Sequence, residues 1–180
     1  MRKLTSFLFI SLDGVVESPN TFVRPNVYED IPELIRETIA EQDTVLLGRK
    51  MYEEWSHFWP DSKIEPFASF INSHPKIVVS STLSILKWSN STLLDRDLAS
   101  AVGTLKARPG KAIGVHGSVS LVQSLLLAGL LDELRFIQVP AIAGHGRRML
   151  DHPGAARQLD LQYSRATPTG LQYLVYTPQL

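Results

Sequence analysis

Four groups of residues in this sequence combine glycines with hydroxyl, acidic or basic side chains, and each group follows an apolar run. Glycine lets the backbone approach a ligand, arginine can pair with a phosphate through two hydrogen bonds, and a helix start presents free N–H groups. Ligands of open α/β sheets bind at the carboxyl ends of strands, so these groups are candidates for one anion site. They are Asp13-Gly14, Gly48-Arg49, Ser80-Ser81-Thr82 and His116-Gly117-Ser118.

The group His116-Gly117-Ser118 is the most informative of the four, because an apolar strand precedes its glycine and an amphipathic helix follows. That order aims free N–H groups and the positive end of a helix at an anion. Gly48-Arg49 also opens a helix, although a turn glycine beside a surface arginine has the same pattern. Ser80, Ser81 and Thr82 are equally typical of caps and turns.

Composition and spacing exclude several other kinds of site. The chain has no cysteine, which excludes disulfides, thiolate metal sites and a cysteine nucleophile. Its five histidines lack metal-ligand spacing, so no metal is expected. Walker and dinucleotide-binding glycine motifs are absent, and Gly144-His145-Gly146 does not lead into a helix. Neither Ser81 nor Ser118 lies in a Gly-x-Ser-x-Gly hydrolase motif.

Apolar runs and helical spacing alternate along most of the chain. Ile31, Leu34 and Ile39 recur at helical spacing, and Pro60 ends the helix that Arg49 opens. Asp95 or Asp97 can cap a later helix. The predicted strands are 3–12, 44–47, 76–81, 91–94, 111–115 and 134–139. The predicted helices are 31–39, 49–59, 64–73, 98–108 and 118–128. A final hairpin joins the strands 158–166 and 171–177 through a turn at 168–170.

This alternation predicts an α/β fold with a mostly parallel central sheet, helices on both faces and a C-terminal antiparallel hairpin. Because no repeat or linker divides the sequence, we expect residues 1–180 to form a single domain. The start, MRKLTSFLFISL, lacks the small-residue cleavage site of a signal peptide. No run approaches the ~20 apolar residues of a membrane span, so we expect a cytoplasmic protein with no membrane partner.

The acidic and basic side chains balance at 18 each, which leaves no general attraction to nucleic acid. A small molecule is therefore the expected partner. The closing hairpin should also leave apolar faces exposed at the edge of the sheet, which makes a homodimer a further expectation.

Four stretches, in order, resemble the dihydrofolate-reductase-like family. The branch that they resemble shares its fold with the reductase domain of the riboflavin-pathway bifunctional deaminase-reductase. The resemblance implies a dihydrofolate-reductase-like three-layer sandwich and NADPH as the hydride donor. The stretches are SLDGVVE (11–17), DTVLLGRKMYE (43–53), KIVVSSTL (76–83) and VHGSVSLVQSLLLAGLLDELRFIQVPAIAGHGRRML (115–150).

The resemblance also implies which residues contact the parts of NADPH. Beside the 2′-phosphate it implies Gly48 and Arg49 with Ser80, Ser81 and Thr82. Beside the pyrophosphate it implies the backbone N–H groups of Gly117, Ser118 and Val119. Beside the nicotinamide it implies Asp13, Gly14 and the main chain of Val16.

The sequence departs from the family in three respects. Met51 replaces the usual threonine and removes a hydroxyl near the phosphates, and His116-Gly117-Ser118 replaces the more usual double glycine. The acid that protonates pterin in true dihydrofolate reductases has no secure counterpart, although Glu29, Asp30 and Glu33 lie near its place. The substrate is therefore not implied by the resemblance.

The leading hypothesis is hydride transfer from NADPH to a C=N group or a carbonyl. Asp13 is the first candidate for a catalytic polar group, followed by Glu33, because a buried carboxyl with a raised pKa can donate a proton. Asp13 can instead cap a turn. The aromatic residues Phe22, Tyr52, Trp55 and Trp59 either wall the substrate pocket or belong to the core.

Three functions remain open. The first is a reductase of the 5-amino-6-(5-phosphoribosylamino)uracil type, in which Arg147 or Arg148 would hold the substrate phosphate. The second is a dihydrofolate-reductase-type pterin reductase or a general carbonyl reductase. The third is a non-catalytic nucleotide-binding module on the same fold, which the loss of threonine at Met51 favours.

Overall fold

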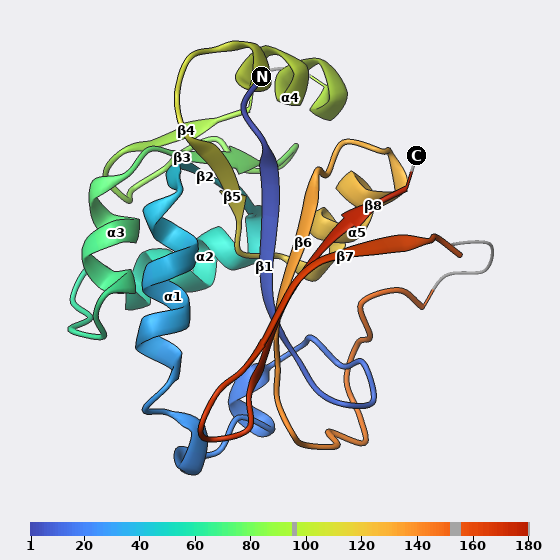
Figure 1. The fold of residues 1–180 in the computed structure, drawn as a ribbon. Helices are drawn as coiled ribbons and strands as arrows, with labels where there is room; N and C mark the ends of the chain where they lie inside the picture. The colour runs from blue at the N-terminus through green and yellow to red at the C-terminus, as the bar shows by residue number, and fades with distance from the viewer. Residues whose placement is uncertain (95–96, 152–155, 180) are drawn as a thin grey trace.

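The computed structural model describes residues 1–94, 97–151 and 156–179 and is built around one eight-stranded sheet (Figure 1). The strand order is β4-β3-β2-β5-β1-β6-β8-β7. The strands are β1 (Leu4–Ile10), β2 (Gln42–Gly48), β3 (Lys76–Val79), β4 (Ser91–Leu93), β5 (Ala112–Val115), β6 (Glu133–Gln138), β7 (Leu159–Ala166) and β8 (Gln172–Pro178).

The strands from β4 to β6 pair in parallel, whereas β8 pairs antiparallel with β6 and with β7. This arrangement confirms the predicted mostly parallel sheet with a C-terminal antiparallel hairpin. Because β1 lies in the middle of the sheet, both of its faces are covered, which explains why its residues read as a continuous apolar run.

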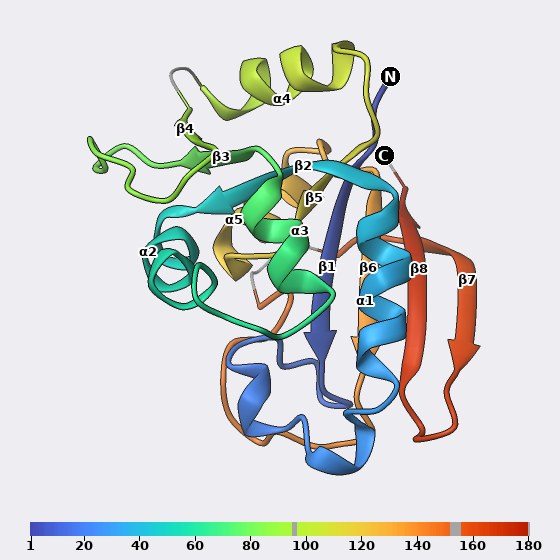
Figure 2. The same ribbon diagram turned by 90° about the vertical axis from the view of Figure 1, so that its left-hand side faces the viewer.

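Helices cover both faces of the sheet and complete three layers (Figure 2). Side chains of α1, α2 and α3 pack on one face, and side chains of α4 and α5 pack on the other. None of the helices in the described ranges is long and apolar enough to cross a membrane. The helices are α1 (Ile31–Ala40), α2 (Arg49–Phe58), α3 (Phe67–Ser73), α4 (Leu98–Ala107) and α5 (Val119–Leu127), with short 3-10 turns at Pro19–Thr21 and Pro25–Val27.

Two strands end earlier than their apolar runs predict. The strand predicted over 76–81 stops at Val79, because the Ser80 hydroxyl accepts the backbone N–H groups of Thr82 and Leu83 and turns the chain. The first strand stops at Ile10 rather than at residue 12, because Ser11 begins a hydrogen-bonded turn. Local side-chain and backbone hydrogen bonds therefore set these boundaries.

The predicted cap of α4 is confirmed at Asp97. Its carboxylate accepts the backbone N–H of Ser100 at 3.0 Å, as an N-cap side chain should. The alternative cap, Asp95, lies outside the described residues.

A buried ion network joins the amino-terminal ends of the strands. Arg135 donates to Glu133 and to Glu41, at 2.6 Å in each case, and Lys3 donates to Glu133 at 2.5 Å. Burial alone would raise the pKa of Glu133, but the hydrogen bonds from Lys3 and Arg135 more than offset this effect and lower it. Glu133 therefore contributes stability above the ordinary carboxyl pKa and loses it as the pH falls through its lowered pKa.

We predict that Arg135→Met lowers the free energy of unfolding by about 3 kcal/mol, because it leaves Glu133 buried with only Lys3 as a partner. Urea denaturation at pH 7 measures this loss. The matched control is Arg36→Met, which removes an exposed pair with Glu33 and should cost less than about 0.5 kcal/mol. Equal losses in the two variants would contradict a stabilising buried network.

Candidate functional site

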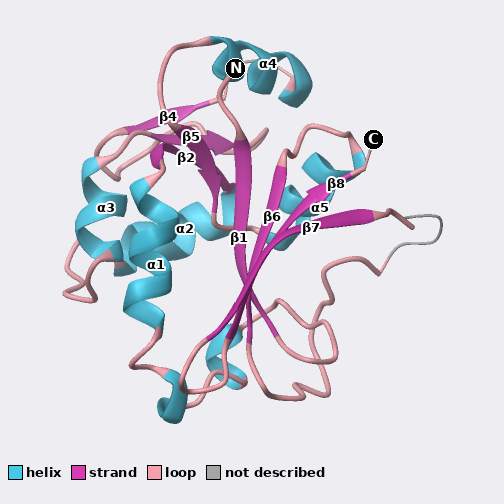
Figure 3. Ribbon diagram, in the orientation of Figure 1, coloured by secondary structure: helices cyan, strands magenta, loops and turns pink. Residues whose placement is uncertain are grey.

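The parallel register brings three of the four residue groups together at one rim of the sheet. Gly48 lies opposite Val79 on β3, and Leu46 lies opposite Val115 on β5. Arg49, Ser80 and His116 therefore leave neighbouring strands at a similar level. β2 leads directly into α2, and three residues connect β5 to α5; Figure 3 draws the helices in cyan and the strands in magenta.

The fourth group, Asp13-Gly14, lies farther along the same edge. β5 ends level with Ser6 of β1, whereas β1 continues to Ile10. Four further residues of strand add about 13 Å. The loop after β1 and the rim at Gly48 can therefore contact different parts of one extended ligand.

The starts of α2 and α5 meet at Gly48 and Ser118. A Cβ atom added to Gly48 would collide with the Ser118 hydroxyl and would lie 3.3 Å from the Ser118 Cβ. Gly48 and Ser118 are the N-cap residues of α2 and α5, and neither helix has a side-chain cap hydrogen bond. The first N–H groups of a helix have no partner within the helix. Two positive helix ends thus converge on one small region, which suits an anion.

Gly117 supplies the conformation that this convergence needs. Its φ of +137° lies in a range that side chains rarely adopt, and a Cβ atom there would collide with the terminal methyl group of Met51. Met51 therefore packs against the Gly117 backbone where the family usually has a threonine. We call the region between the starts of α2 and α5 the cradle. At this point of the cradle, the apolar packing of Met51 replaces a hydroxyl group.

Arg49 and the serines take up surface positions at the same rim. The Arg49 guanidinium donates to Glu53, one helical turn away, at 3.0 Å and is half-exposed. Ser80 has a turn-forming role, whereas Ser81 and Thr82 are exposed. Arg49 and the turn at Ser80 thus follow the ends of two neighbouring strands.

A buried polar network that the sequence analysis did not identify lies behind the cradle. His116 and Gln42 share a hydrogen bond of 2.8 Å, and the Gln42 amide donates to Thr5 at 3.3 Å. Burial lowers the pKa of His116 to about 3, so its ring is neutral at physiological pH. Because Gln42 donates through its nitrogen, its oxygen accepts from the Nε2–H of His116. In the sequence, the signal that could have indicated this network is the presence of polar residues within otherwise apolar strands.

Asp13 caps the loop after β1. Its carboxylate accepts from the Ser11 hydroxyl at 2.6 Å and from the N–H groups of Ala143 and Gly144 at 2.9 and 3.0 Å. These hydrogen bonds, led by the one from Ser11, lower the pKa of Asp13 to about 2. The expectation of a raised pKa is therefore wrong, and the alternative of a capping aspartate is confirmed.

The capped loop is also tied to the segment 147–149. Val16 donates its N–H to the Arg147 carbonyl at 3.0 Å, and Met149 donates to the Gly14 carbonyl at 3.1 Å. Gly14 adopts a φ of +84° to make this turn. Gly14 and Val16 are thus held in place by backbone hydrogen bonds.

Glu33 and its acidic neighbours do not provide a buried acid. Glu33 is 61% exposed and pairs with Arg36, because it lies on the solvent side of α1. Glu29 is exposed, and Asp30 accepts hydrogen bonds from Thr169, which lower its pKa. The expectation that Glu33 is a buried proton donor is wrong.

The aromatic candidates do not form one pocket wall. Phe22 is buried in the cluster beneath α1, and Tyr52 is buried in the cluster beneath α2 and α3. The Tyr52 hydroxyl accepts the Trp88 N–H at 3.0 Å, which is a core contact. The core interpretation therefore holds for Phe22 and Tyr52. Trp55 is partly exposed, and its ring packs edge-on against Phe67.

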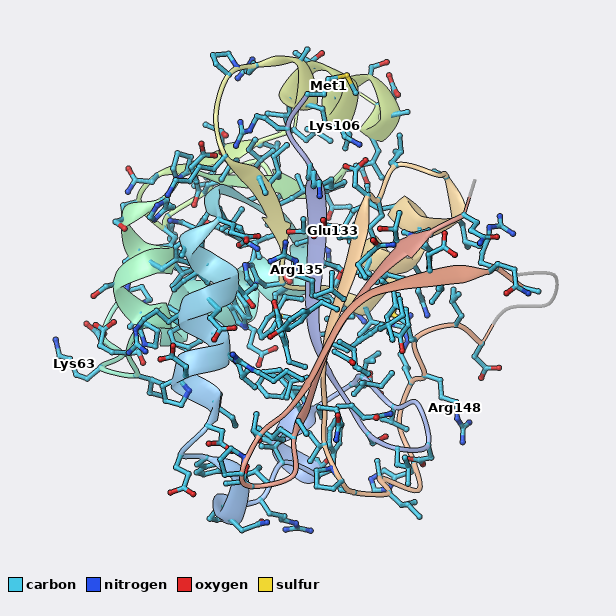
Figure 4. All side chains as sticks on the ribbon, in the orientation of Figure 1. Met1, Lys63, Lys106, Glu133, Arg135 and Arg148 are labelled. Atoms are coloured by element: carbon cyan, nitrogen blue, oxygen red, sulfur yellow. The ribbon has the colours of Figure 1, made fainter. Side chains whose placement is uncertain are left out.

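Arg147 and Arg148 lie beside a hollow on the flank of α5. Arg147 donates to Gln123 at 3.1 Å, and Arg148 donates to the Asp13 carbonyl at 3.0 Å. Figure 4 shows Arg148 at the outside of the molecule, well away from Glu133 and Arg135. The hollow measures about 230 Å³ and is lined by Gln123, Leu127, Arg147, Arg148, Leu150 and Asp151.

We predict that Gly48→Ala lowers the free energy of unfolding by about 1–3 kcal/mol, because the added methyl group pushes Ser118 away. Thermal or urea unfolding measures the change. The matched control is Gly103→Ala in α4, where no atom lies within 4 Å of the added Cβ. This helical substitution should stabilise the protein by about 0.5–1 kcal/mol. A neutral Gly48→Ala would show that the two helix starts are not in tight contact.

A family model and one curated relative each match nearly the whole chain. The family model described as the RibD C-terminal domain matches residues 2–173. The uncharacterized protein YyaP of Bacillus subtilis (strain 168) is 26% identical over 181 residues, covering 97% of this chain and 94% of that protein.

Two solved structures share the fold. A putative riboflavin biosynthesis protein from Shewanella sp. PV-4 has a TM-score of 0.74 and 18% identity, over 99% of each chain. A pyrimidine reductase-like protein from Corynebacterium diphtheriae NCTC has a TM-score of 0.63 and 14% identity, over 99% of this chain and 92% of that chain. These likenesses confirm the dihydrofolate-reductase-like architecture expected from the sequence.

Proposed function

The chain belongs to the RibD C-terminal domain family, and on this premise we propose that it is a reductase that transfers a hydride from NADPH to a small pyrimidine-type heterocycle. The observation that carries the proposal is the contact between Gly48 and Ser118, which joins the uncapped starts of α2 and α5. A pyrophosphate is the part of a dinucleotide that such paired helix ends favour. The names of the two solved relatives, a riboflavin biosynthesis protein and a pyrimidine reductase-like protein, support the substrate class.

In this proposal, the cradle binds the pyrophosphate through backbone N–H groups. Gly117, Ser118 and Val119 present theirs from the start of α5, and Gly48 allows the ligand to approach the start of α2. A side chain at Gly48 or Gly117 would fill this space, as the collisions of an added Cβ indicate. The residues of the cradle therefore fit a pyrophosphate group.

Arg49 then discriminates between the two nicotinamide cofactors. Its half-exposed guanidinium pairs with the half-exposed Glu53 of the same helix, so it can turn towards a 2′-phosphate at the rim. A guanidinium pairs with phosphate through two charge-assisted hydrogen bonds. Ser81 and Thr82 supply hydroxyl donors beside it, whereas Ser80 holds the turn that presents them.

The loop after β1 positions the reacting end of the ligand. Asp13 is ionised and fixes the loop by accepting three hydrogen bonds, so its role is to orient Gly14 and Val16. The bound cofactor would supply the hydride, and the protein supplies orientation and a surface from which water is excluded. Trp55 remains the candidate for contact with a flat substrate ring.

We predict that Arg49→Ala weakens NADPH binding by about 1.5–3 kcal/mol, because a charge-assisted hydrogen bond is lost. NADH has no 2′-phosphate, so its affinity should not change. Fluorescence or calorimetric titration measures both constants, with Arg108→Ala at the exposed C-terminal end of α4 as the matched control. Equal affinity of the wild type for NADPH and NADH would sink the role of Arg49. Failure to bind either cofactor would sink the reductase proposal.

The pKa of Asp13 leads to a second prediction. Since that pKa is about 2, Asp13 is ionised throughout the neutral range, and its stabilising effect is lost only as the pH falls below the ordinary value of 3.8 towards 2. Asp13→Asn should lower kcat/KM about tenfold, because one positioning interaction is lost. The factor should stay the same at every pH from about 5 to 9. The pH–rate profile measures this, with exposed Asp61→Asn as a control. A limb of the profile that disappears in Asp13→Asn would identify Asp13 as a proton donor instead.

A nucleotide-binding module without turnover is the second candidate. It is favoured because Asp13 and Glu33 are both engaged in other contacts and because Met51 occupies the threonine position. NADPH that binds tightly but is not oxidised in the presence of pterin or ribosylamino-pyrimidine substrates would favour the module. Substrate-dependent oxidation would exclude it.

A further inference from the structure

The buried polar network behind the cradle connects three neighbouring strands through side chains. Thr5 lies on β1, Gln42 begins β2, and His116 follows the end of β5; all three are buried. The Gln42 amide nitrogen donates to the Thr5 hydroxyl at 3.3 Å, and its oxygen shares the hydrogen bond of 2.8 Å with His116. This network adds side-chain hydrogen bonds to the backbone ladders of the sheet.

Gly114 makes room for the network in the central strand of the three. β5 lies between β2 and β1, and Thr5 lies opposite Gly114 in the parallel register. A Cβ atom added to Gly114 would collide with the Gln42 amide, which therefore passes over the glycine on its way to β1. A glycine inside a strand often marks such a close approach. His116 then meets the amide oxygen from the end of β5.

Aromatic rings enclose the His116 side chain. The ring of Phe67 packs edge-on against the imidazole with 5.1 Å between centroids, and the rings of Phe7 and Phe70 do so at 5.9 and 6.1 Å. Because burial leaves the imidazole neutral, it has no charge with which to attract an anion. The hydrogen bond to Gln42 fixes the tautomer and the orientation of the ring. His116 is therefore suited to hold a position rather than to supply charge.

The position that His116 holds is the start of the cradle. The ladder of β5 ends at Val115, and Gly117, which comes next after His116, has no side chain with which to anchor the chain. The cap residue Ser118 makes no side-chain hydrogen bond to its helix. The anchored imidazole therefore determines where the N–H groups of Gly117 and Ser118 lie and in which direction they point.

We propose that His116 is a positioning residue of the cradle, which Gln42 and Thr5 hold so that the first N–H groups of α5 face the pyrophosphate. The inference rests on the proposed function, in which those N–H groups bind the cofactor. If the network served the fold alone, a pair of apolar side chains of similar size would replace His116 and Gln42 without loss. Replacing both partners of a buried hydrogen bond leaves no unpaired group and is often nearly neutral for stability.

Titration of NADPH into three variants tests the proposal. The variants are Gln42→Met, His116→Leu and the double variant that carries both changes. We expect each to raise the dissociation constant of NADPH about fivefold, the effect of about one lost hydrogen bond. Because the two residues act through one network, the double variant should lose no more affinity than either single variant. The isolated pyrophosphate ion should lose affinity by the same factor, since it contacts the cradle alone.

Tyr173→Phe is the matched control. The Tyr173 and Thr38 hydroxyls share a buried hydrogen bond of 3.1 Å between β8 and α1, three strands away from β5. Its loss should lower the melting temperature but leave the NADPH affinity unchanged. The conservative variant His116→Gln retains an N–H donor for Gln42 and should keep the dissociation constant within about twofold of the wild type.

Two further readouts separate positioning from a general loss of stability. The network variants should raise the KM for NADPH and leave kcat unchanged, because the cradle binds the cofactor equally in the ground state and the transition state. In NMR spectra of the free protein, the amide signals of Gly117 and Ser118 should move in the double variant. Those of Leu98 and Ala99 at the start of α4 should stay.

The outcomes distinguish this inference from the proposed function. An NADPH affinity that is unchanged in the double variant would overturn the role of His116 and leave the proposed function standing. Equal losses of affinity in the double variant and in Tyr173→Phe would overturn that role too, because a general loss of stability would then explain both. A wild type that binds neither NADPH nor pyrophosphate would overturn the proposed function and this inference together.

Discussion

The level alignment of three parallel strand ends is the constraint on which the rest of the site depends. β3, β2 and β5 pair in a register that brings Gly48 next to the turn at Ser80 and next to the start of α5. Only glycine at position 48 leaves room for Ser118, and only this approach brings two uncapped helix ends together. Behind the cradle, the hydrogen bonds of the neutral His116 with Gln42, and of Gln42 with Thr5, link the residue after β5 to β2 and β1.

Much of this arrangement could be predicted from the sequence, because it depends on local patterns. Alternating strands and helices predicted a parallel sheet, and parallel strands must end at a common edge. The sequence alone therefore predicts that Gly48-Arg49 and His116-Gly117-Ser118 lie at one rim of the sheet. The hairpin at 168–170 followed from its turn residues in the same way.

Other features depend on contacts between distant residues, which local patterns do not contain. The nearby Ser11 hydroxyl contributes most to the low pKa of Asp13, but its carboxylate also accepts from Ala143 and Gly144, which are far from it in sequence and could not be predicted as its partners. Tyr52 is a core residue because its hydroxyl meets Trp88, whereas the helical spacing alone allowed a pocket wall. The network of Thr5, Gln42 and His116 spans three strands and became visible only in the folded chain.

An amide-resolved NMR titration with NADPH tests most directly whether paired helix ends form the binding site. The account predicts that the largest backbone shifts occur at Arg49 and Lys50 in α2 and at Val119 and Ser120 in α5, since these N–H groups begin the two helices. Titration of the isolated pyrophosphate ion should move the same amides. Shifts confined to one helix start, or concentrated at the hollow beside Arg147, would contradict the cradle.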